Sequence, residues 1–113
     1  MPISPTQRSL KHLKEQGYTV AITEKWNPHA RIRQDLFGFV DLLAIREGMT
    51  LAIQTTSSNN YADRKKKVQD HENLPKVLSA GWQVRIHGWR KNAKGKWVVR
   101  EESVSLSLPC ETC

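Results

Sequence analysis

One carboxylate, Asp41, stands inside an otherwise apolar run over residues 39–45. Ionised groups rarely stay in dry surroundings without a partner, so Asp41 needs a hydrogen-bond donor or a cation beside it. A second β-favouring run over residues 50–56 follows after a short polar link, and this spacing predicts an antiparallel hairpin. If residues 47–48 form a two-residue turn, Asp41 lies directly opposite Gln54 on the same face of the sheet.

Thr56 extends this pair into a small polar cluster. It follows Gln54 by two positions, and the period-two alternation of a strand places both side chains on one face. A one-residue bulge would send the side chains to the opposite face and dissolve the cluster. The alternative interpretation is a satisfied polar pair, in which Asp41 accepts hydrogen bonds from Gln54 and from backbone groups without any cation.

The basic run of the following helix, expected over residues 61–71, can add positive charge to this cluster. At 100° per residue, Lys65 falls on the apolar stripe that faces the sheet, and Arg64 falls at its edge. Lys66 and Lys67 are expected to face water. The alternative for the whole run is a solvated basic face.

The elements that must position these residues follow from caps, breakers and periodicity. Ser4 and Pro5 are typical of a helix start, and Gly17 is typical of a helix end. We expect a helix over 4–17, strands over 18–26, 39–45 and 50–56, a helix over 61–71, a short helix over 76–80, and strands over 82–89 and 97–108. Trp89 and Trp97 are expected to form a cross-strand pair in the last hairpin. This order predicts an α/β domain built around one mixed sheet.

Charge narrows the class of partner. The chain carries 18 Lys and Arg against 11 Asp and Glu, a net charge of +7. Residues 60–100 hold 11 of the cations and 3 of the acids, so 11 − 3 = +8 lies in this part. A surplus of this kind most simply indicates a polyanionic partner. If the second helix and the last hairpin lie on the side of Asp41, they form a basic groove around it.

The sequence also predicts the cellular compartment and the number of domains. No apolar run is long enough to span a bilayer, and the first residues lack the blocks of a signal peptide, so we expect a soluble, cytoplasmic protein with no membrane partner. Residues 1–109 are expected to form one domain, and residues 110–113 a flexible tail. Cys110 and Cys113 in that tail lack the further ligands of a zinc site and are interpreted as reduced and frayed.

The order of elements and the segment 33–43, Arg-Gln-Asp-Leu-Phe-Gly-Phe-Val-Asp-Leu-Leu, resemble the PD-(D/E)XK nuclease superfamily. Within it, the segment is similar to the VRR-NUC and Holliday-junction-resolvase-like branches, and the likeness covers about residues 4–90. The resemblance implies an αβββαβ restriction-endonuclease-like core, with a mixed sheet flanked by helices and an added C-terminal strand.

In this superfamily the Asp and a second-strand acid bind a divalent metal, and a Lys activates water. Asp41 matches the first position, whereas Gln54 stands where the acid is usual and Thr56 where the Lys is usual. The resemblance therefore implies Mg²⁺ or Mn²⁺ on Asp41 and Gln54, with Lys65 replacing the missing Lys. Asp35 is expected as a further ligand, and Glu15 and Glu24 are the auxiliary candidates.

The sequence thus predicts a small basic nucleic-acid-binding protein with a metal-dependent endonuclease activity, and it supports binding more strongly than cleavage. DNA is favoured over RNA, and a homodimer stays open. The alternatives are a catalytically degenerate nucleic-acid-binding module and a protein-interaction domain with an acidic partner. The expected nucleic-acid contacts are Arg64, Lys66, Lys67, Arg90, Lys91, Lys94 and Lys96.

Overall fold

The first helix, α1 (Pro5–Glu15), begins and ends where its capping residues predict. In the computed structural model, which describes residues 3–105, Ser4 Oγ accepts a hydrogen bond from the Gln7 amide at 3.2 Å. Pro5 occupies the first helical position, where a missing N–H costs nothing. Gly17 ends the helix with a φ of +93°, a left-handed conformation that glycine adopts without strain.

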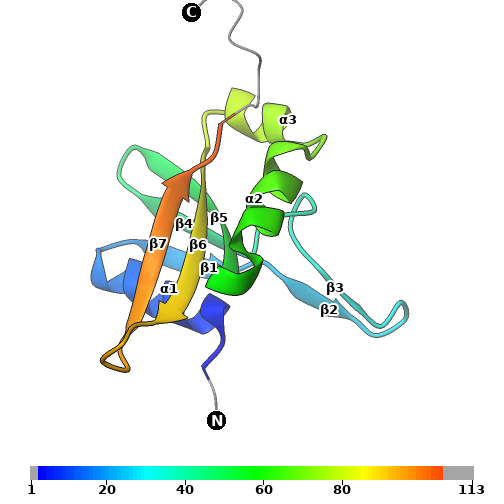
Figure 1. The fold of residues 1–113 in the computed structure, drawn as a ribbon. Coiled ribbons are helices and arrows are strands. Elements are labelled where there is room, and N and C mark those ends of the chain that lie inside the picture. Colours follow the sequence, from blue (N-terminus) through cyan, green and yellow to red (C-terminus); the bar gives the residue numbers. More distant parts are fainter. Residues whose placement is uncertain (1–2, 106–113) are drawn as a thin grey trace, which may run out of the picture.

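A five-stranded mixed sheet forms the centre of the molecule, with the strand order β1-β4-β5-β6-β7 (Figure 1). β5 and β6 are parallel, and the other neighbours are antiparallel. The strands are β1 (Thr19–Ile22), β4 (Leu42–Arg46), β5 (Met49–Ser57), β6 (Gln83–Lys91) and β7 (Trp97–Ser103). The predicted α/β class with a mixed sheet flanked by helices is confirmed.

The hairpin of β4 and β5 has the expected register. Arg46 pairs with Met49 around a two-residue turn, in which Gly48 takes a φ of +74°. Leu42 pairs with Ile53, and this is the last pair of the ladder. Beyond it the Asp41 amide donates to the Ile53 carbonyl at 2.9 Å, one position off the regular register. The predicted contact of Asp41 with Gln54 forms all the same, since Gln54 Nε2 donates to Asp41 Oδ2.

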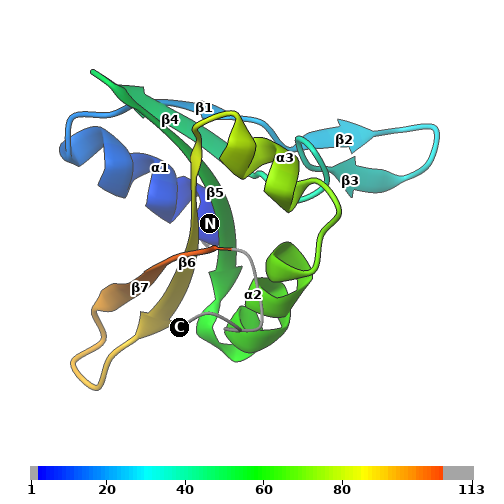
Figure 2. The same cartoon turned by 90° about the horizontal axis from the view of Figure 1, so that it is seen from above.

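Helices cover both faces of the sheet (Figure 2). On one face α1 packs over a core of Leu13, Tyr18, Leu42, Ala44, Leu51 and Ile53. On the other face, α2 (Tyr61–Gln69) and α3 (Leu74–Ser79) follow the short 3₁₀ turn η1 (Ser58–Asn60). Their core includes Phe39, Ala52, Tyr61, Val68, Leu74, Val77, Val84 and Ile86. Because side chains alternate along β5, Gln54 and Thr56 belong to the α2 face and Thr55 belongs to the α1 face.

The predicted strand over 18–26 is wrong in its length. The chain leaves the sheet at Thr23, whose amide donates to the Asp41 carbonyl at 2.8 Å and whose hydroxyl donates to the Val40 carbonyl at 2.7 Å. It then forms β2 (Lys25–Asn27), which pairs with β3 (Ile32–Gln34) in a separate two-stranded sheet. This hairpin, residues 25–34, projects from the body of the molecule (Figures 1 and 2). We call it the arm.

The last hairpin differs from expectation in its aromatic pairing. Trp89 pairs with Val99, and Trp97 pairs with Lys91, so the predicted cross-strand tryptophan pair does not form. Trp89 is instead buried, with its Nε1 donating to Ser9 Oγ at 2.8 Å. Trp97 stays half exposed beneath the Arg8 guanidinium, which lies 3.9 Å from its ring centroid.

Several expectations concern residues near the C-terminus. β7 ends at Ser103, and the rest of the strand predicted to reach residue 108 lies mostly outside the described residues. The interpretation of residues 110–113 as a flexible tail with reduced Cys110 and Cys113 also lies outside them. Within residues 3–105, no helix is long and apolar enough to cross a membrane.

Candidate metal centre

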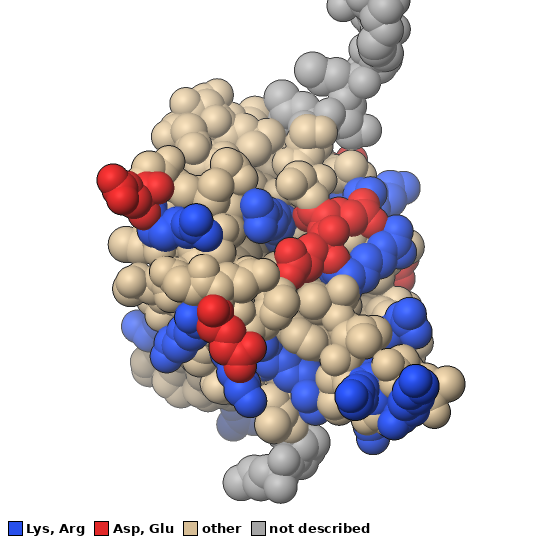
Figure 3. All heavy atoms as spheres, turned by 90° about the vertical axis from the view of Figure 1, so that its left-hand side faces the viewer, with Lys and Arg blue, Asp and Glu red and all other residues tan. Residues whose placement is uncertain are grey.

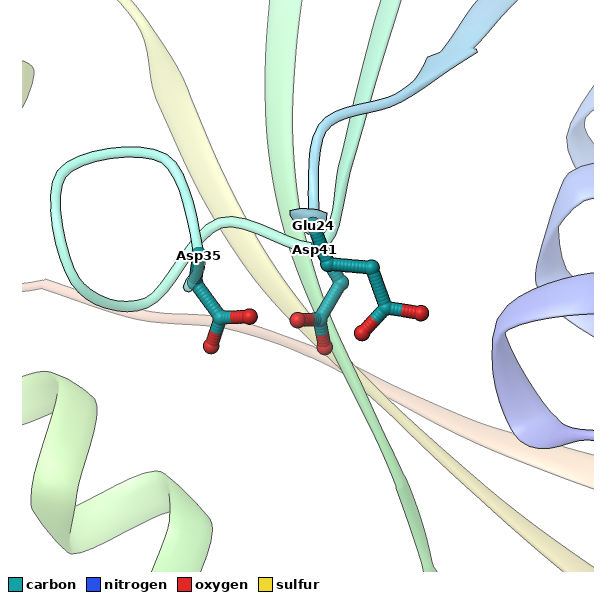
Figure 4. Close-up of side chains that lie close together, drawn as sticks. All are labelled: Glu24, Asp35 and Asp41. Atoms are coloured by element: carbon teal, nitrogen blue, oxygen red, sulfur yellow. The ribbon is translucent and has the colours of Figure 1, made fainter. Parts of the chain in front are cut away.

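Three acidic side chains from separate segments converge at the start of β4. Glu24, Asp35 and Asp41 each offer a carboxylate oxygen, and these atoms lie within 4.8 Å of one another. Figure 4 shows the three carboxylates turned toward a common space. Glu24 immediately precedes β2, Asp35 immediately follows β3, and Asp41 immediately precedes β4. The arm therefore begins and ends at two of the three acids.

Backbone hydrogen bonds hold these segments together. The bonds from Thr23 to residues 40 and 41 place Glu24 beside Asp41. The Leu36 amide donates to the Val40 carbonyl at 3.1 Å, which closes the turn after Asp35. Within this turn Phe37 has a φ of +55° and Gly38 a φ of +90°. The convergence of the acids is thus a property of the backbone and does not depend on a bound ion.

Asp41 lies at the centre of a hydrogen-bond network. It is 4% exposed, and its Oδ2 accepts from Gln54 Nε2 at 2.5 Å, from the Thr55 amide at 2.9 Å and from Thr55 Oγ1 at 3.2 Å. Gln54 is 2% exposed, and its Oε1 has no hydrogen-bond partner among the described residues. A buried acceptor of this kind costs free energy unless a cation or a donor reaches it.

The environment of Asp41 favours its protonated form. Burial, the largest cause, and a hydrogen bond with Asp35 together raise the pKa of this carboxyl to about 8, against the opposing effect of the Thr55 amide. The negative charges of Asp35 and Glu24 act in the same direction as burial. Carboxylates this close cannot all ionise without a compensating positive charge. The cluster therefore holds a proton near neutral pH when no cation is bound.

Thr55 and Thr6 belong to the site, and the sequence reasoning missed both. Thr55 Oγ1 lies 2.8 Å from Thr6 Oγ1, so a chain of hydrogen bonds runs from α1 through β5 to Asp41. Strand alternation had placed Thr55 on the face away from the cluster. Asp41, however, lies just before β4, where its carboxylate reaches around the edge of β5. Thr6 lies in the first turn of α1, and no motif in the sequence connects that turn with Asp41.

The acids line a cleft of about 300 Å³, and two cations line it with them. Arg64 and Lys67 extend from α2 to the cleft. The full lining is Pro5, Thr6, Glu24, Asp35, Asp41, Gln54, Thr55, Arg64 and Lys67. The cleft thus contains both acidic and basic side chains, an arrangement suited to a metal ion with a bound phosphate.

Three predicted site residues lie elsewhere. Lys65 does not line the cleft, because its Nζ donates to Glu102 Oε2 on β7 at 2.6 Å. Thr56 is buried beside its pairing partner Gly88 and does not line the cleft either. Glu15 lies along a groove between α1 and β7. Of the expected metal ligands and auxiliary acids, the structure brings together Asp41, Gln54, Asp35 and Glu24.

The expected single basic groove is also wrong. The cleft is lined by Arg64 and Lys67 of α2 and by no residue of the last hairpin, whose residue Trp97 contacts Arg8 of α1 instead. Lys66 is exposed on α2, outside the cleft lining. Figure 3 shows Lys and Arg side chains gathered near that hairpin tip. The exposed cations at this end of the molecule are Arg90, Lys91, Lys94 and Lys96.

The donor set at the cleft fits a hard divalent cation. Mg²⁺ and Mn²⁺ prefer carboxylate and amide oxygens, and here three carboxylates lie together in a cleft that Gln54 also lines. The fold and the cleft together define an α/β domain with an acidic, cation-flanked site at the edge of its central hairpin. No model of a known protein family matches the chain, and a search of curated proteins finds no match.

Proposed function

We propose that the protein is a metal-dependent endonuclease of the PD-(D/E)XK type that hydrolyses phosphodiester bonds in DNA. The observation that carries this proposal is the convergence of Glu24, Asp35 and Asp41 in a cleft that Gln54 also lines. The order of elements supports it, because α1-β1-β4-β5-α2-β6, with the arm strands β2 and β3, the turn η1 and α3 inserted between them, follows the αβββαβ order that the resemblance implies.

The acids compensate for the departure at position 54. Sequence alone left Asp41 without its usual second carboxylate, and the arm's two flanking residues, Glu24 and Asp35, supply that charge. Asp41, Asp35 and Glu24 would hold Mg²⁺ or Mn²⁺ together with Gln54 Oε1. A divalent ion bound there supplies Lewis-acid polarisation of a phosphoryl oxygen and a water of lowered pKa.

The remaining residues of the cleft orient the site and its substrate. Gln54 Nε2 and Thr55 hold the Asp41 carboxylate in one orientation, and Thr6 holds Thr55 in turn. Arg64 and Lys67 provide the positive charge for a phosphate, in place of the Lys that the family carries at the position of Thr56. Preorganised charges of this kind stabilise the negative charge that develops on the phosphoryl group.

The test is cleavage of supercoiled plasmid DNA with Mg²⁺, Mn²⁺ or EDTA, by the unaltered protein and by Asp41→Asn. We expect cutting with Mn²⁺ or Mg²⁺, none with EDTA, and a loss of about 100-fold or more in Asp41→Asn. The matched control is Asp63→Asn, which removes an exposed carboxylate at the start of α2 and is expected to cut normally.

Two results would count against the proposal in different ways. Cutting that persists in Asp41→Asn or in EDTA would refute the assignment of the site. Salt-sensitive DNA binding without any cutting, under all metal conditions, would instead support the degenerate nucleic-acid-binding module.

A further inference from the structure

The arm carries a charge pattern of its own. Residues 25–34 contain three cations, Lys25, Arg31 and Arg33, and no Asp or Glu. Lys25 and Arg31 are exposed, and so is His29 at the tip. Residues 73–100 also carry cations and no Asp or Glu, so what distinguishes the arm is its projection from the body directly beside the acids Glu24 and Asp35. A ribbon of this composition is complementary to a polyanion.

The arm also stands directly on the candidate metal centre. Glu24 precedes its first residue and Asp35 follows its last, and both carboxylates face Asp41 (Figure 4). At 3.3 Å per residue, each limb of the ribbon is on the order of 15 Å long. A polyanion held along the arm therefore passes within a few nucleotides of the acidic cleft.

The arm contributes little to the core. Trp26 is 55% exposed and Ile32 is 51% exposed, although both are large apolar side chains within strands. A two-stranded ribbon without a covering layer is marginally stable in water, and the exposure of Trp26 and Ile32 shows that this one gains little from packing on the body. Its exposed aromatic and aliphatic side chains are available for contacts outside the chain.

The turn of the arm places a cation where the backbone favours another residue. Asn27 Oδ1 accepts from the His29 amide at 3.0 Å and from the Ala30 amide at 3.2 Å, which closes the turn. Arg31 then takes a φ of +55°. This left-handed conformation is strained for a residue with a side chain, whereas glycine adopts it freely. A glycine at position 31 would relieve this strain, but it would also remove the guanidinium group from the turn.

The dimensions of the arm favour one form of nucleic acid. The major groove of B-form DNA, about 12 Å wide, admits a two-stranded β-ribbon. The major groove of double-stranded RNA is deep and too narrow for side chains to read. A ribbon with cations on both strands can contact the phosphates on either side of a DNA groove.

We infer that the arm is a contact element for double-stranded DNA, which seats the duplex over the cleft at its base. This inference rests on the proposed function and specifies the form of its substrate. Lys25 and Arg31 contact the phosphate backbone, and Trp26 contributes its exposed ring. Phosphate contacts of this kind fix position and orientation without selecting a sequence.

The experiment measures binding of a duplex of about 30 base pairs in EDTA, between about 50 and 200 mM salt. The test variant is Lys25→Ala/Arg31→Gly, in which the glycine removes the cation and relieves the left-handed strain, so that the turn should still form. We expect the affinity to fall about tenfold at low salt, and the salt slope to decrease by about 2.

The matched control is Lys14→Ala/Lys76→Ala, which removes two exposed cations at the end of α1 and on α3, outside the arm. We expect its affinity to change by less than about threefold, through the loss of net charge alone. Mn²⁺ binding is expected to be unchanged in both double variants, and thermal stability is expected to be no lower than that of the unaltered protein. These two readouts show that the arm variant keeps its fold and its metal site.

Equal affinities of the test and control variants would overturn the inference, and so would a preference of the unaltered protein for double-stranded RNA or for single strands. Failure of the proposed function gives a different pattern. In that case no variant cuts DNA, while Lys25→Ala/Arg31→Gly still binds the duplex more weakly than its control.

Discussion

At the scale of single residues, Asp41 has conflicting surroundings that a cation would resolve. Its Oδ2 accepts three hydrogen bonds, which favour the ionised carboxylate, whereas burial and Asp35 raise its pKa to about 8. Near neutral pH the carboxyl therefore exchanges its proton for a metal ion when one binds. The binding of the metal and the release of the proton are linked.

The first prediction follows from the direction of this shift. Below a pKa of about 8, a proton on Asp41 competes with the metal, so the affinity for Mn²⁺ is expected to rise with pH and to level off above that value. The rise should approach tenfold per pH unit at the acidic end, about pH 6. Isothermal titration across this range measures it. A flat profile in the unaltered protein would contradict the prediction, and Asp41→Asn should bind weakly at every pH.

The second prediction concerns the position where the usual acid is missing. Gln54→Glu places a fourth carboxylate beside Asp41 and removes the amide that donates to Asp41 Oδ2. In EDTA we expect the free energy of unfolding to fall by about 1–3 kcal/mol, because like charges are buried together. Saturating Mn²⁺ should restore the loss. Urea unfolding with and without Mn²⁺ measures both effects, and Gln54→Met is the control that Mn²⁺ should not rescue.

At the scale of elements, β6 is the strand on which the two layers of helices meet. On the α1 side, Ser9 Oγ accepts from Trp89 Nε1 and lies 2.9 Å from His87 Nδ1. On the α2 side, Gly88 lies directly under the ring of Tyr61. The absence of a side chain at Gly88 lets α2 approach the sheet, which places Arg64 and Lys67 at the cleft.

The third prediction tests this close approach. A Cβ at position 88 would overlap the Tyr61 ring, and the ring cannot move without shifting α2. We expect Gly88→Ala to lower the free energy of unfolding by about 1–3 kcal/mol, as overpacking does elsewhere. Urea unfolding measures it. Tyr61→Ala should cost less in the Gly88→Ala background than alone, and purely additive losses would show that the two positions do not interact.

The hairpin of β4 and β5 and the cap of α1 were predictable because short-range chemistry determines them. A two-residue turn sets the register of β4 against β5, and Ser4 with Pro5 sets the start of α1. The arm was not predictable, since its strands of three residues are too short to show alternation. Lys65 was expected beside Asp41, but Arg64 lines the cleft in its place. Lys65 pairs instead with Glu102, a partner far away in sequence. Periodicity contains no information about such partners.

At the scale of the whole molecule, a buried polar network joins α1, β6 and β7. His87 is fully buried. The charged or titratable groups near it are His12 on α1, Glu101 on β7 and Arg85 on β6. Burial lowers the pKa of His87 to about 4, although the Glu101 carboxylate acts in the opposite direction. The folded chain therefore keeps this imidazole neutral at pH values where the unfolded chain protonates it.

The fourth prediction gives the sign of the resulting pH dependence. Between the ordinary pKa of 6.5 and the folded value of about 4, the unfolded chain binds the extra proton. The free energy of unfolding should therefore fall as pH falls across this window, by about 3 kcal/mol from His87. Urea unfolding at several pH values measures it. His87→Gln should flatten this part of the profile, and an unchanged slope would assign the effect to other groups.

The flanking of the arm by Glu24 and Asp35 has a thermodynamic consequence for how metal and DNA act on each other. A cation shared by these acids and Asp41 would restrain both ends of the arm, and DNA held by the arm would restrain the same two ends. Any factor by which the metal tightens DNA binding would then equal the factor by which DNA tightens metal binding. In the proposed nuclease, the binding of the metal and the binding of the substrate would share one coupling free energy, carried by the two short connections at residues 24 and 35.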